Sequence, residues 1–262
     1  MQHLVSIITP SYNCAKYIEE TIQSIQAQTY TNWELLITDD CSTDESVDII
    51  RNYSATDSRI KLFILKENSG AGVARNNSIK EARGRFIAFC DSDDRWYPNK
   101  LECQLAFIKE NGCALSYASY DVCDELGHKT GHVNCLSKLT PKEILRDNGI
   151  GCLTAIYDTH VIGKCYMPSM RKRQDWCLWI DIINKIGEAK GVQIPLALYR
   201  NRDSSISSNK IEMLKFNYEV YHTFLKRSCL ESWSILIFRF LPYYFYKKII
   251  QKFNYRVNLN QN

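Results

Sequence analysis

Short apolar runs alternate with helix-like patterns along the first half of the chain. Five runs of strand length are apolar nearly throughout: Val5–Thr9, Trp33–Thr38, Ile60–Leu65, Arg85–Cys90 and Cys113–Cys123. Four segments between them have a helical pattern: Ala15–Gln28, Asp44–Tyr53, Gly72–Arg83 and Asn99–Asn111. Strands that alternate with helices predict an α/β fold with a mostly parallel sheet flanked by helices. Because the strands lack polar alternation, we expect the sheet to be buried on both faces.

Polar residues gather directly after three of these strands. Thr9–Asn13 (TPSYN) follows the first strand, Asp39–Asp44 (DDCSTD) follows the second, and Asp91–Asp94 (DSDD) follows the fourth. The carboxyl ends of parallel strands share one edge of a sheet, and ligands of such sheets bind there. We therefore expect the three segments to converge on one pocket.

The acidic segment Asp91–Asp94 has the densest charge of the three. Carboxylates this close raise one another's pKa unless a cation compensates, and Mg²⁺ or Mn²⁺ accepts one or two carboxylates together with substrate phosphates. In an extended segment Asp91 and Asp93 would point to the same side and address one metal. The alternative is a turn before a helix N-terminus, where aspartate is common. The two other polar strand ends favour the metal.

The loop Glu67–Ser78 (ENSGAGVARNNS) places two glycines before a helical pattern, with Arg75 close behind them. A helix N-terminus with a nearby arginine attracts phosphate. A glycine pair before a helix is also typical of a plain turn.

Composition and charge narrow the class of protein. The chain has 262 residues and a formal net charge of only +4, so nothing in it calls for nucleic acid as a partner. Eleven cysteines are scattered without a CxxC pair, and no signal peptide is recognisable. We expect a cytoplasmic protein with reduced thiols. Cys123, His128, His132 and Cys135 suggest a zinc site, but their spacing is not a standard ligand pattern, and a hairpin with a DELG turn fits the segment better.

The C-terminal segment Ser232–Val257 is rich in aromatic and basic residues. Arg239 and Pro242 interrupt its apolar stretch, which falls short of the ~20 residues of a spanning helix. Such a composition is typical of a helix lying on an anionic membrane surface. The alternatives are a helix packed on the rest of the protein or a dimer contact.

Four blocks, VSIITPSYN, QTYTNWELLITDDCSTD, NSGAGVARN and FCDSDD, resemble the family 2 glycosyltransferases of the GT-A fold in order and spacing. The resemblance is close over about the first 115 residues and looser to about residue 205. It implies a GT-A domain at 1–205, with a nucleotide-binding half at about 1–115 and an acceptor half at about 116–205. A helical C-terminal extension, for which association with the membrane is one expectation, would occupy 206–262.

The resemblance also implies an inverting enzyme that moves a sugar from a nucleotide diphosphate sugar, most often UDP-linked, to an acceptor hydroxyl. Carried over by position, Pro10 and Tyr12 would lie along the nucleoside. Asp40 would hydrogen-bond the base, with Asp39 beside it, and Arg75 would lie near the diphosphate.

Asp91, Ser92 and Asp93 match the family's DxD motif. Asp93 would bind the metal, Mg²⁺ or Mn²⁺, and Asp91 would face the ribose or the metal's water ligands. A metal that bridges both phosphates stabilises the charge that the leaving nucleoside diphosphate gains.

An inverting transfer needs a carboxylate that takes the proton of the acceptor hydroxyl. The family typically has an acid followed by Asp at the start of a helix, and this chain has Gln174 and Asp175 there. The resemblance therefore assigns the base to Asp175 alone, whereas a plain helix cap is the alternative. Asp181, later on the same helix, is expected on the surface. The segment Pro195–Asn209 resembles the family's mobile loop near the donor, with Arg200 and Arg202 as possible helpers.

The implied partners are a nucleotide-sugar donor and a saccharide or lipid-linked saccharide acceptor, as in the synthesis of O-antigen, capsule or exopolysaccharide. Two other functions stay open. A nucleotidyltransferase that makes nucleotide sugars would usually carry a glycine-rich basic loop after the first strand, where this chain has PSYNCAKY. A non-catalytic nucleotide-sugar-binding subunit would not need the acidic motif and Asp175.

Overall fold

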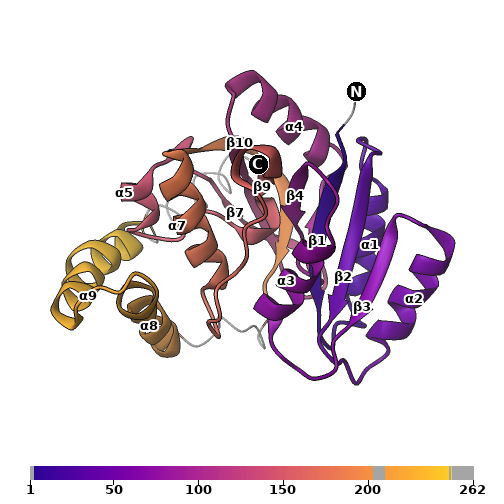
Figure 1. Cartoon of the computed structure of the whole chain (residues 1–262), viewed down its shortest axis with the longest axis horizontal. Coiled ribbons are helices and arrows are strands. Elements are labelled where there is room, and N and C mark those ends of the chain that lie inside the picture. The colour runs from indigo at the N-terminus through magenta and orange to yellow at the C-terminus, as the bar shows by residue number, and fades with distance from the viewer. Residues whose placement is uncertain (1–2, 203–209, 248, 250–262) are drawn as a thin grey trace.

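The computed structural model describes residues 3–202, 210–247 and 249 (Figure 1). Within these residues ten strands form one mixed sheet in the order β3-β2-β1-β4-β9-β6-β10-β5, with β7 paired to β6 and β8 paired to β10. The strands are β1 (Val5–Ser11), β2 (Trp33–Asp39), β3 (Ile60–Ile64), β4 (Phe86–Phe89), β5 (Arg95–Trp96), β6 (Leu115–Cys123), β7 (Lys129–Val133), β8 (Lys138–Leu139), β9 (Ile156–Asp158) and β10 (Ala189–Arg200).

Helices connect these strands and extend the chain beyond them. They are α1 (Ile18–Gln26), α2 (Ser46–Thr56), α3 (Ala71–Glu81), α4 (Lys100–Asn111), α5 (Pro141–Ile144), α6 (Thr159–Ile162), α7 (Gln174–Ile186), α8 (Lys210–Glu219) and α9 (Cys229–Ile235). A 3-10 turn covers Cys152–Thr154, and π-helical turns cover Val220–Phe224 and Leu236–Phe240. The five strands and four helices predicted in the first half are all present, with bounds shifted by at most a few residues.

The order of strands creates a crevice at one edge of the sheet. β1 pairs in parallel with both β2 and β4, and β2 pairs in parallel with β3. The chain therefore moves outward from β1 to β3 and then returns to the other side of β1. Ligands of open sheets bind beyond the carboxyl ends of the strands at such a reversal. The polar segments after β1 and β4 both lie there.

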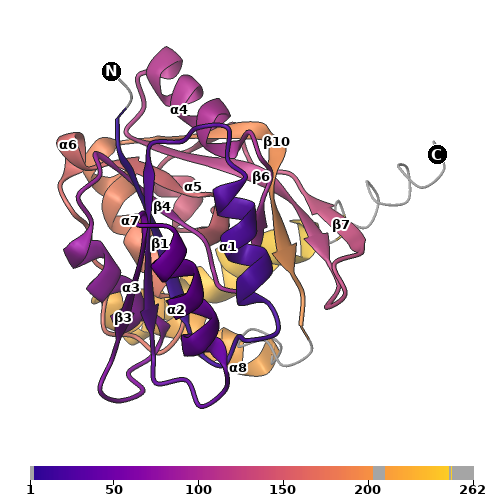
Figure 2. The same ribbon diagram turned by 90° about the vertical axis from the view of Figure 1, so that its right-hand side faces the viewer.

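Each face of the parallel strands packs against its own set of helices. Ile7 and Leu35 belong to a core with apolar residues of α1, α2 and α4, whereas Ile8 and Leu36 belong to a core with residues of α3 and α7. Successive side chains of a strand point to opposite faces. Both faces are therefore covered, as the unbroken apolar runs predict (Figure 2).

The C-terminal helices pack against the end of the molecule that carries α5 and α7, far from β3 and α2 (Figure 1). Phe240 lies against Trp176 with ring centroids 6.2 Å apart, and Tyr221 meets the same indole edge-on at 5.8 Å. Lys247 forms an ion pair of 2.8 Å with Asp147. One face of the extension thus shares the core of α7. Among the described residues, no helix combines the length and the apolar character that crossing a membrane requires.

The hairpin predicted around the DELG turn is confirmed. β6 and β7 pair antiparallel, and the carboxylate of Asp124 accepts the backbone N–H groups of Leu126 and His128, both at 2.9 Å. His132 hydrogen-bonds Asp121 at 2.7 Å. The described part of the chain holds no group of three or more metal-ligating side chains of His, Cys, Asp or Glu type. All eleven cysteines are free, and most of them fill core positions.

Lys100, at the start of α4, is fully buried with its ammonium 4.0 Å from the centre of the Trp96 ring. Its Nζ has no hydrogen-bond partner among the described residues. Burial lowers the pKa of Lys100 to about 7 from an ordinary value of 10.5. The unfolded chain therefore binds more protons than the folded one between about pH 7 and 10.5. Through this group the free energy of unfolding rises with pH across that window.

We expect Lys100→Met to raise the free energy of unfolding by at least about 1 kcal/mol at pH 7, because it removes an unpaired buried charge. The gain should shrink as the pH rises above 7, since the cost of deprotonating the wild-type lysine on folding falls as the pH approaches 10.5. Urea denaturation at pH 7 and pH 9 measures both effects. Lys109→Met, on the exposed face of the same helix, is the control and should change little. A gain that does not depend on pH would contradict this account of Lys100.

Candidate active site

The loops after β1 and β2 are joined by hydrogen bonds at the sheet edge. The buried carboxylate of Asp39 accepts the Ser11 hydroxyl at 2.8 Å and both the backbone N–H and the hydroxyl of Ser42. The backbone N–H of Asn13 donates back to the Ser42 hydroxyl at 2.9 Å. Asp39 therefore joins these two loops through hydrogen bonds. Tyr12 lies in the first of them with its side chain half exposed, so its ring can contact a ligand.

Asp40 joins the loop after β2 to the glycine loop, the segment Glu67–Gly70 that precedes α3. Its two carboxylate oxygens accept the backbone N–H groups of Ser69 and Gly70, each at 2.7 Å. Gly70 has a φ of 92°, a conformation that L side chains rarely adopt, and α3 begins directly after it. The carboxylate thus shapes the turn that precedes α3. Each oxygen keeps a second lone pair for a further donor.

The acidic segment after β4 is a turn and not an extended strand. The backbone N–H of Asp94 donates to the Asp91 carbonyl at 3.1 Å, which closes the turn. The expectation that Asp91 and Asp93 point to one side of an extended segment is therefore wrong. Arg75, whose side chain is almost fully buried, instead donates to the Asp91 carboxylate at 2.5 Å.

Arg200 and Arg202, at the end of β10, hold the other two acids. Arg202 lies 2.8 Å from the Asp93 carboxylate. Arg200 donates from its backbone N–H to Asp94 at 2.9 Å and from Nε to the Asp93 carbonyl at 3.0 Å. The side chain of Arg200 is only 1% exposed and holds the acidic turn to the end of β10. It therefore cannot contact the donor from a mobile loop, as was expected from the sequence. Residues 203–209 of that predicted loop lie outside the described residues.

The acidic turn is electrostatically unsatisfied despite these arginines. Burial raises the pKa of the Asp93 carboxyl, with the Asp91 charge adding to the rise and Arg202 opposing it. Burial raises the pKa of Asp94 well above its ordinary value, and the charges of Asp93 and Asp91 add to that rise. One Asp94 oxygen is buried without a hydrogen-bond partner among the described residues. Additional positive charge at this turn would therefore be stabilising.

These residues fit a divalent cation that a substrate helps to hold. Asp91 and Asp93 offer oxygen ligands, as Mg²⁺ and Mn²⁺ prefer. Both side chains are partly exposed, at 29% and 18%. Since the described residues contain no group of three ligating side chains, phosphate oxygens would have to complete the coordination.

Asp175 lies in the first turn of α7 and approaches the same site. Although burial opposes the charge on Arg75, the pKa of its guanidinium is raised, because Asp91 and, more weakly, Asp175 favour that charge. Asn148 donates from Nδ2 to the Asp175 carboxylate at 2.8 Å. The hydrogen bond orients one oxygen of Asp175. Asp181, on the same helix, is exposed as predicted.

Gln174, which precedes Asp175, packs where α3 and α7 meet. A Cβ added to Gly72 would come within 2.8 Å of the Gln174 amide, so only glycine fits at that point without a shift. The amide also donates to the carbonyl of Met170. The start of α7 is therefore seated on the start of α3, next to Arg75.

The structure brings most of the predicted site residues to one sheet edge. The loops and turns that carry Asp39, Asp40, Arg75, Asp91, Asp93 and Asp175 have the contacts described above. Pro10 is a buried residue near the end of β1, and Ser92 lies in the acidic turn near Cys14. Asn148 was missed as a positioning residue, and Arg200 was given a different role. Asn148 sits in a polar loop without any pattern, and the role of Arg200 depends on strand pairing that the sequence does not show.

The chain matches the family model "Glycosyl transferase family 2" over residues 6–164. The chain belongs to glycosyl transferase family 2. Two bacterial relatives align with this chain over most of their length. The putative teichuronic acid biosynthesis glycosyltransferase TuaG of Bacillus subtilis (strain 168) is 43% identical over 83% of this chain and 87% of its own. The Escherichia coli protein WfgD, a UDP-Glc:alpha-D-GlcNAc-diphosphoundecaprenol beta-1,3-glucosyltransferase, is 39% identical over 89% of this chain and 91% of its own.

Solved structures confirm the GT-A fold that family 2 membership implies. S. aureus TarS 1–349 in complex with UDP-GlcNAc superposes with a TM-score of 0.70 at 23% identity, over 88% of this chain and 70% of that one. The mannosyltransferase PcManGT from Pyrobaculum calidifontis, in complex with GDP-Man and Mn²⁺, gives a TM-score of 0.63 at 16% identity, over 90% and 70%. Family 2 membership decides for sugar transfer over the alternative of nucleotidyl transfer.

We expect Asp40→Asn to destabilise the protein by about 1 kcal/mol, because the new amide group leaves one partly buried backbone N–H of the loop before α3 without an acceptor. Urea denaturation measures the loss. Asp48→Asn, which removes a carboxylate from the exposed face of α2, is the matched control and should stay within about 0.5 kcal/mol of wild type. Equal stability of the two variants would show that Asp40 does not hold the glycine loop.

Proposed function

We propose that this family 2 member transfers a sugar, with UDP-glucose as the donor to test first, to a hydroxyl of a saccharide carried on a lipid diphosphate. Cell-surface polysaccharide synthesis is the setting. The observation that carries the proposal is the meeting of Asp91, Asp93, Arg75 and Asp175 at the crevice beyond β1 and β4. WfgD and the 36% identical WfaP, both Escherichia coli proteins, are named for UDP-Glc donors and diphosphoundecaprenol acceptors.

The stereochemistry of the proposed reaction is inversion. The glucose of UDP-glucose is α-linked, whereas WfgD and WfaP are named as beta-1,3-glucosyltransferases. A single displacement by the acceptor hydroxyl on the face opposite UDP gives that outcome. It requires one base on the acceptor side and stabilisation of the leaving group on the donor side.

The donor side is formed by the loops after β1, β2 and β4. The exposed ring of Tyr12 would lie along the nucleoside with Pro10, and Asp40 would accept a base N–H with the oxygen lone pairs that the glycine loop leaves open, beside Asp39. Arg75 would lie close to the diphosphate, where a buried guanidinium interacts most strongly with phosphate charge. Burial and the hydrogen bonds described above keep these groups in place before the donor binds.

The acidic turn would hold the metal. Asp93 would be its ligand, Asp91 would reach it directly or through water, and Ser92 would contact the donor. When bound, Mg²⁺ or Mn²⁺ supplies positive charge to the diphosphate as the glycosidic bond breaks. Burial, with the Asp91 charge adding to it, raises the pKa of Asp93 even beside Arg202, so further positive charge at this carboxylate would be stabilising.

Asp175 would remove the proton from the acceptor hydroxyl. Asn148 donates to one of its oxygens, which leaves the other oxygen to accept a proton in a fixed direction. A base on the first turn of a rigid helix keeps its position during attack.

The C-terminal extension would contact the cytoplasmic face of the membrane that carries the acceptor. Its inward side packs on α7 through Leu236 and Phe240. Its outward side carries exposed large apolar residues: Leu230, Trp233, Ile237, Phe238, Phe245, Tyr246 and Ile249. A helix with such an outward face and nearby basic residues suits the membrane interface.

UDP-glucose with Mn²⁺ should raise the melting temperature of wild type more than UDP-glucose with EDTA does, because the cation offsets repulsion between diphosphate and acidic turn. In Asp93→Ala the two increases should be equal. Differential scanning fluorimetry measures them. A metal-dependent increase that survives in Asp93→Ala would remove Asp93 as the ligand. A panel of nucleotide sugars provides the wider test. If no sugar of the panel stabilises the wild-type protein and the protein hydrolyses none of them, the chain is a non-catalytic subunit and the proposed function fails.

Asp175→Asn should lower the rate of transfer by about 10²–10⁴-fold, the usual contribution of a general base, while the affinity for UDP stays unchanged. Transfer from radiolabelled UDP-glucose to a lipid diphosphate–linked N-acetylglucosamine measures the rate, and calorimetry with UDP measures the affinity. Asp181→Asn, on the exposed side of α7, is the control and should retain wild-type transfer. Retained transfer in Asp175→Asn would refute its role as base.

A further inference from the structure

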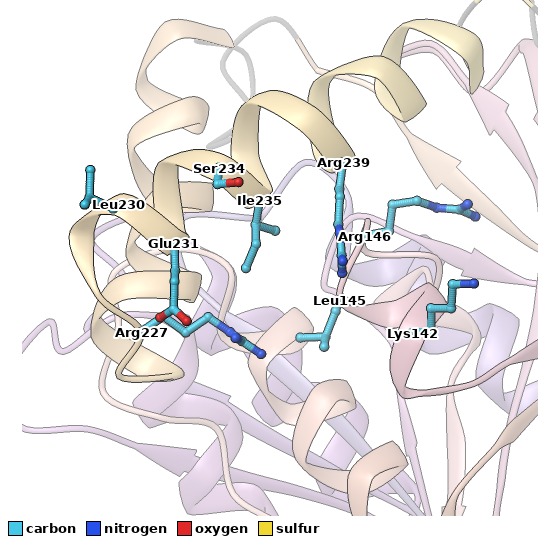
Figure 3. Close-up of a pocket in the computed structure, with 9 residues that line it drawn as sticks. All are labelled: Lys142, Leu145, Arg146, Arg227, Leu230, Glu231, Ser234, Ile235 and Arg239. Atoms are coloured by element: carbon cyan, nitrogen blue, oxygen red, sulfur yellow. The ribbon is translucent and has the colours of Figure 1, made fainter.

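A second cavity, of about 440 Å³, lies between the segment around α5 and the C-terminal helices (Figure 3). The residues that line it are Lys142, Leu145, Arg146, Arg227, Leu230, Glu231, Ser234, Ile235 and Arg239. Figure 3 shows Arg227 and Arg239 approaching Leu145 from two sides. The cavity therefore combines cationic groups with an apolar wall.

The positive charge of this cavity is not compensated. Four basic side chains line it, Lys142, Arg146, Arg227 and Arg239, together with a single carboxylate. None of the four forms an ion pair within the described part of the chain, although the Arg146 guanidinium lies 3.6 Å from the centre of the Tyr243 ring. That carboxylate, Glu231, accepts the backbone N–H and the hydroxyl of Ser228 at the start of α9. Helix capping thus occupies the one acid present.

Other basic residues of the same region do find carboxylates. Lys172 pairs with Glu212 and Lys247 pairs with Asp147, both at 2.8 Å. In the cavity, by contrast, the buried Nε atoms of Arg146 and Arg227 lack a hydrogen-bond partner among the described residues. Buried donors are nearly always paired, so an anion with several oxygens is the complementary ligand. Guanidinium groups bind phosphate oxygens in the bidentate manner.

The apolar wall extends from the cavity to the surface. Leu145 and Ile235 are partly buried, whereas Leu230 at the rim is 84% exposed. The exposed apolar residues of the C-terminal helices continue from there. A ligand with a phosphate head and an apolar chain would have both parts accommodated.

The segment that lines one side of the cavity also contacts the helix turn that carries the proposed base, Asp175. Asn148, which donates to Asp175, lies two residues after Arg146, within about 8 Å of it along the backbone. Trp176 donates from its indole to the Ile144 carbonyl at 2.7 Å. The wall of the cavity that α5 forms is therefore tied to the first turn of α7, which carries Asp175.

We propose that this cavity binds the diphosphate of a polyprenyl diphosphate–linked acceptor, and that Arg227 and Arg239 are the principal ligands. The proposal rests on the proposed function, because it takes the acceptor to be a lipid diphosphate. Arg227, at the start of α9, and Arg239, in the π-helical turn, would bring the diphosphate under the exposed apolar face. The acceptor's lipid chain would leave along Leu230 toward the membrane.

Farnesyl diphosphate, below its micellar concentration and in EDTA, is the probe, and titration calorimetry measures its Kd. The double variant Arg227→Gln/Arg239→Gln should raise that Kd at least tenfold, and Arg227→Lys/Arg239→Lys should restore part of the affinity. Lys215→Gln, which removes an exposed charge of α8 outside the cavity, should change the Kd less than twofold. Each single Gln variant repeats the test if the double variant does not fold.

Farnesol and inorganic pyrophosphate should each bind at least tenfold more weakly than farnesyl diphosphate. An unchanged Kd in the double variant would overturn the proposal. Equal binding of farnesol would show a purely apolar groove, and equal binding of pyrophosphate would show a site for free diphosphate. Displacement of the probe by UDP would place it at the donor site. If the double variant loses binding to phosphatidylglycerol vesicles but keeps its affinity for farnesyl diphosphate, the cavity is a membrane anchor and the proposal fails.

Failure of this proposal and failure of the proposed function are separable. UDP-glucose stabilisation and hydrolysis test the donor site and should be the same in wild type and in the double variant. Absence of both in wild type would refute the proposed function, while a change in the Kd of farnesyl diphosphate would still report on the cavity.

Discussion

The acidic turn after β4 depends on arginines from other parts of the chain. Asp91, Asp93 and Asp94 lie within four residues, and their mutual repulsion has to be offset before the turn is stable. Arg75 on α3 and two arginines at the end of β10 supply that charge. Since β10 is the last strand in sequence, the turn reaches its final geometry only when the whole sheet is assembled.

This dependence joins the two halves of the molecule. The acidic turn lies in the first half of the chain, but Arg200, more than one hundred residues later, fixes it. Its backbone N–H donates to the Asp94 carboxylate, and its Nε donates to the Asp93 carbonyl. A second hydrogen bond, from Asn148 to Asp175, holds the loop after α5 against the start of α7. The acidic turn and the first turn of α7 are therefore each held by a hydrogen bond from a residue far away along the chain.

Periodic patterns explain what the sequence could predict. A strand at Val5–Thr9 and a helix with Ile18, Ile22 and Ile25 on one face could be predicted because the apolar pattern of each is unbroken. The same patterns placed Asp40 and Asp91 at the ends of strands. The three-residue strand β9, antiparallel between β4 and β6, is too short for a pattern. A turn at Asp91–Asp94 was only the alternative to an extended segment, because the contacts that hold it come from Arg75 and Arg200, which lie far away along the chain.

The departure from the family pattern at Gln174 has a physical consequence for Asp175. Arg75 already interacts with Asp91 and lies within electrostatic reach of Asp175. A second carboxylate at position 174 would add negative charge where α7 is seated on Gly72, and it would compete for the same guanidinium. The neutral amide instead bonds to the Met170 carbonyl and packs on Gly72. Asp175 is thereby left as the single acid of the first turn of α7, with Asn148 fixing one of its oxygens and the other directed by that bond.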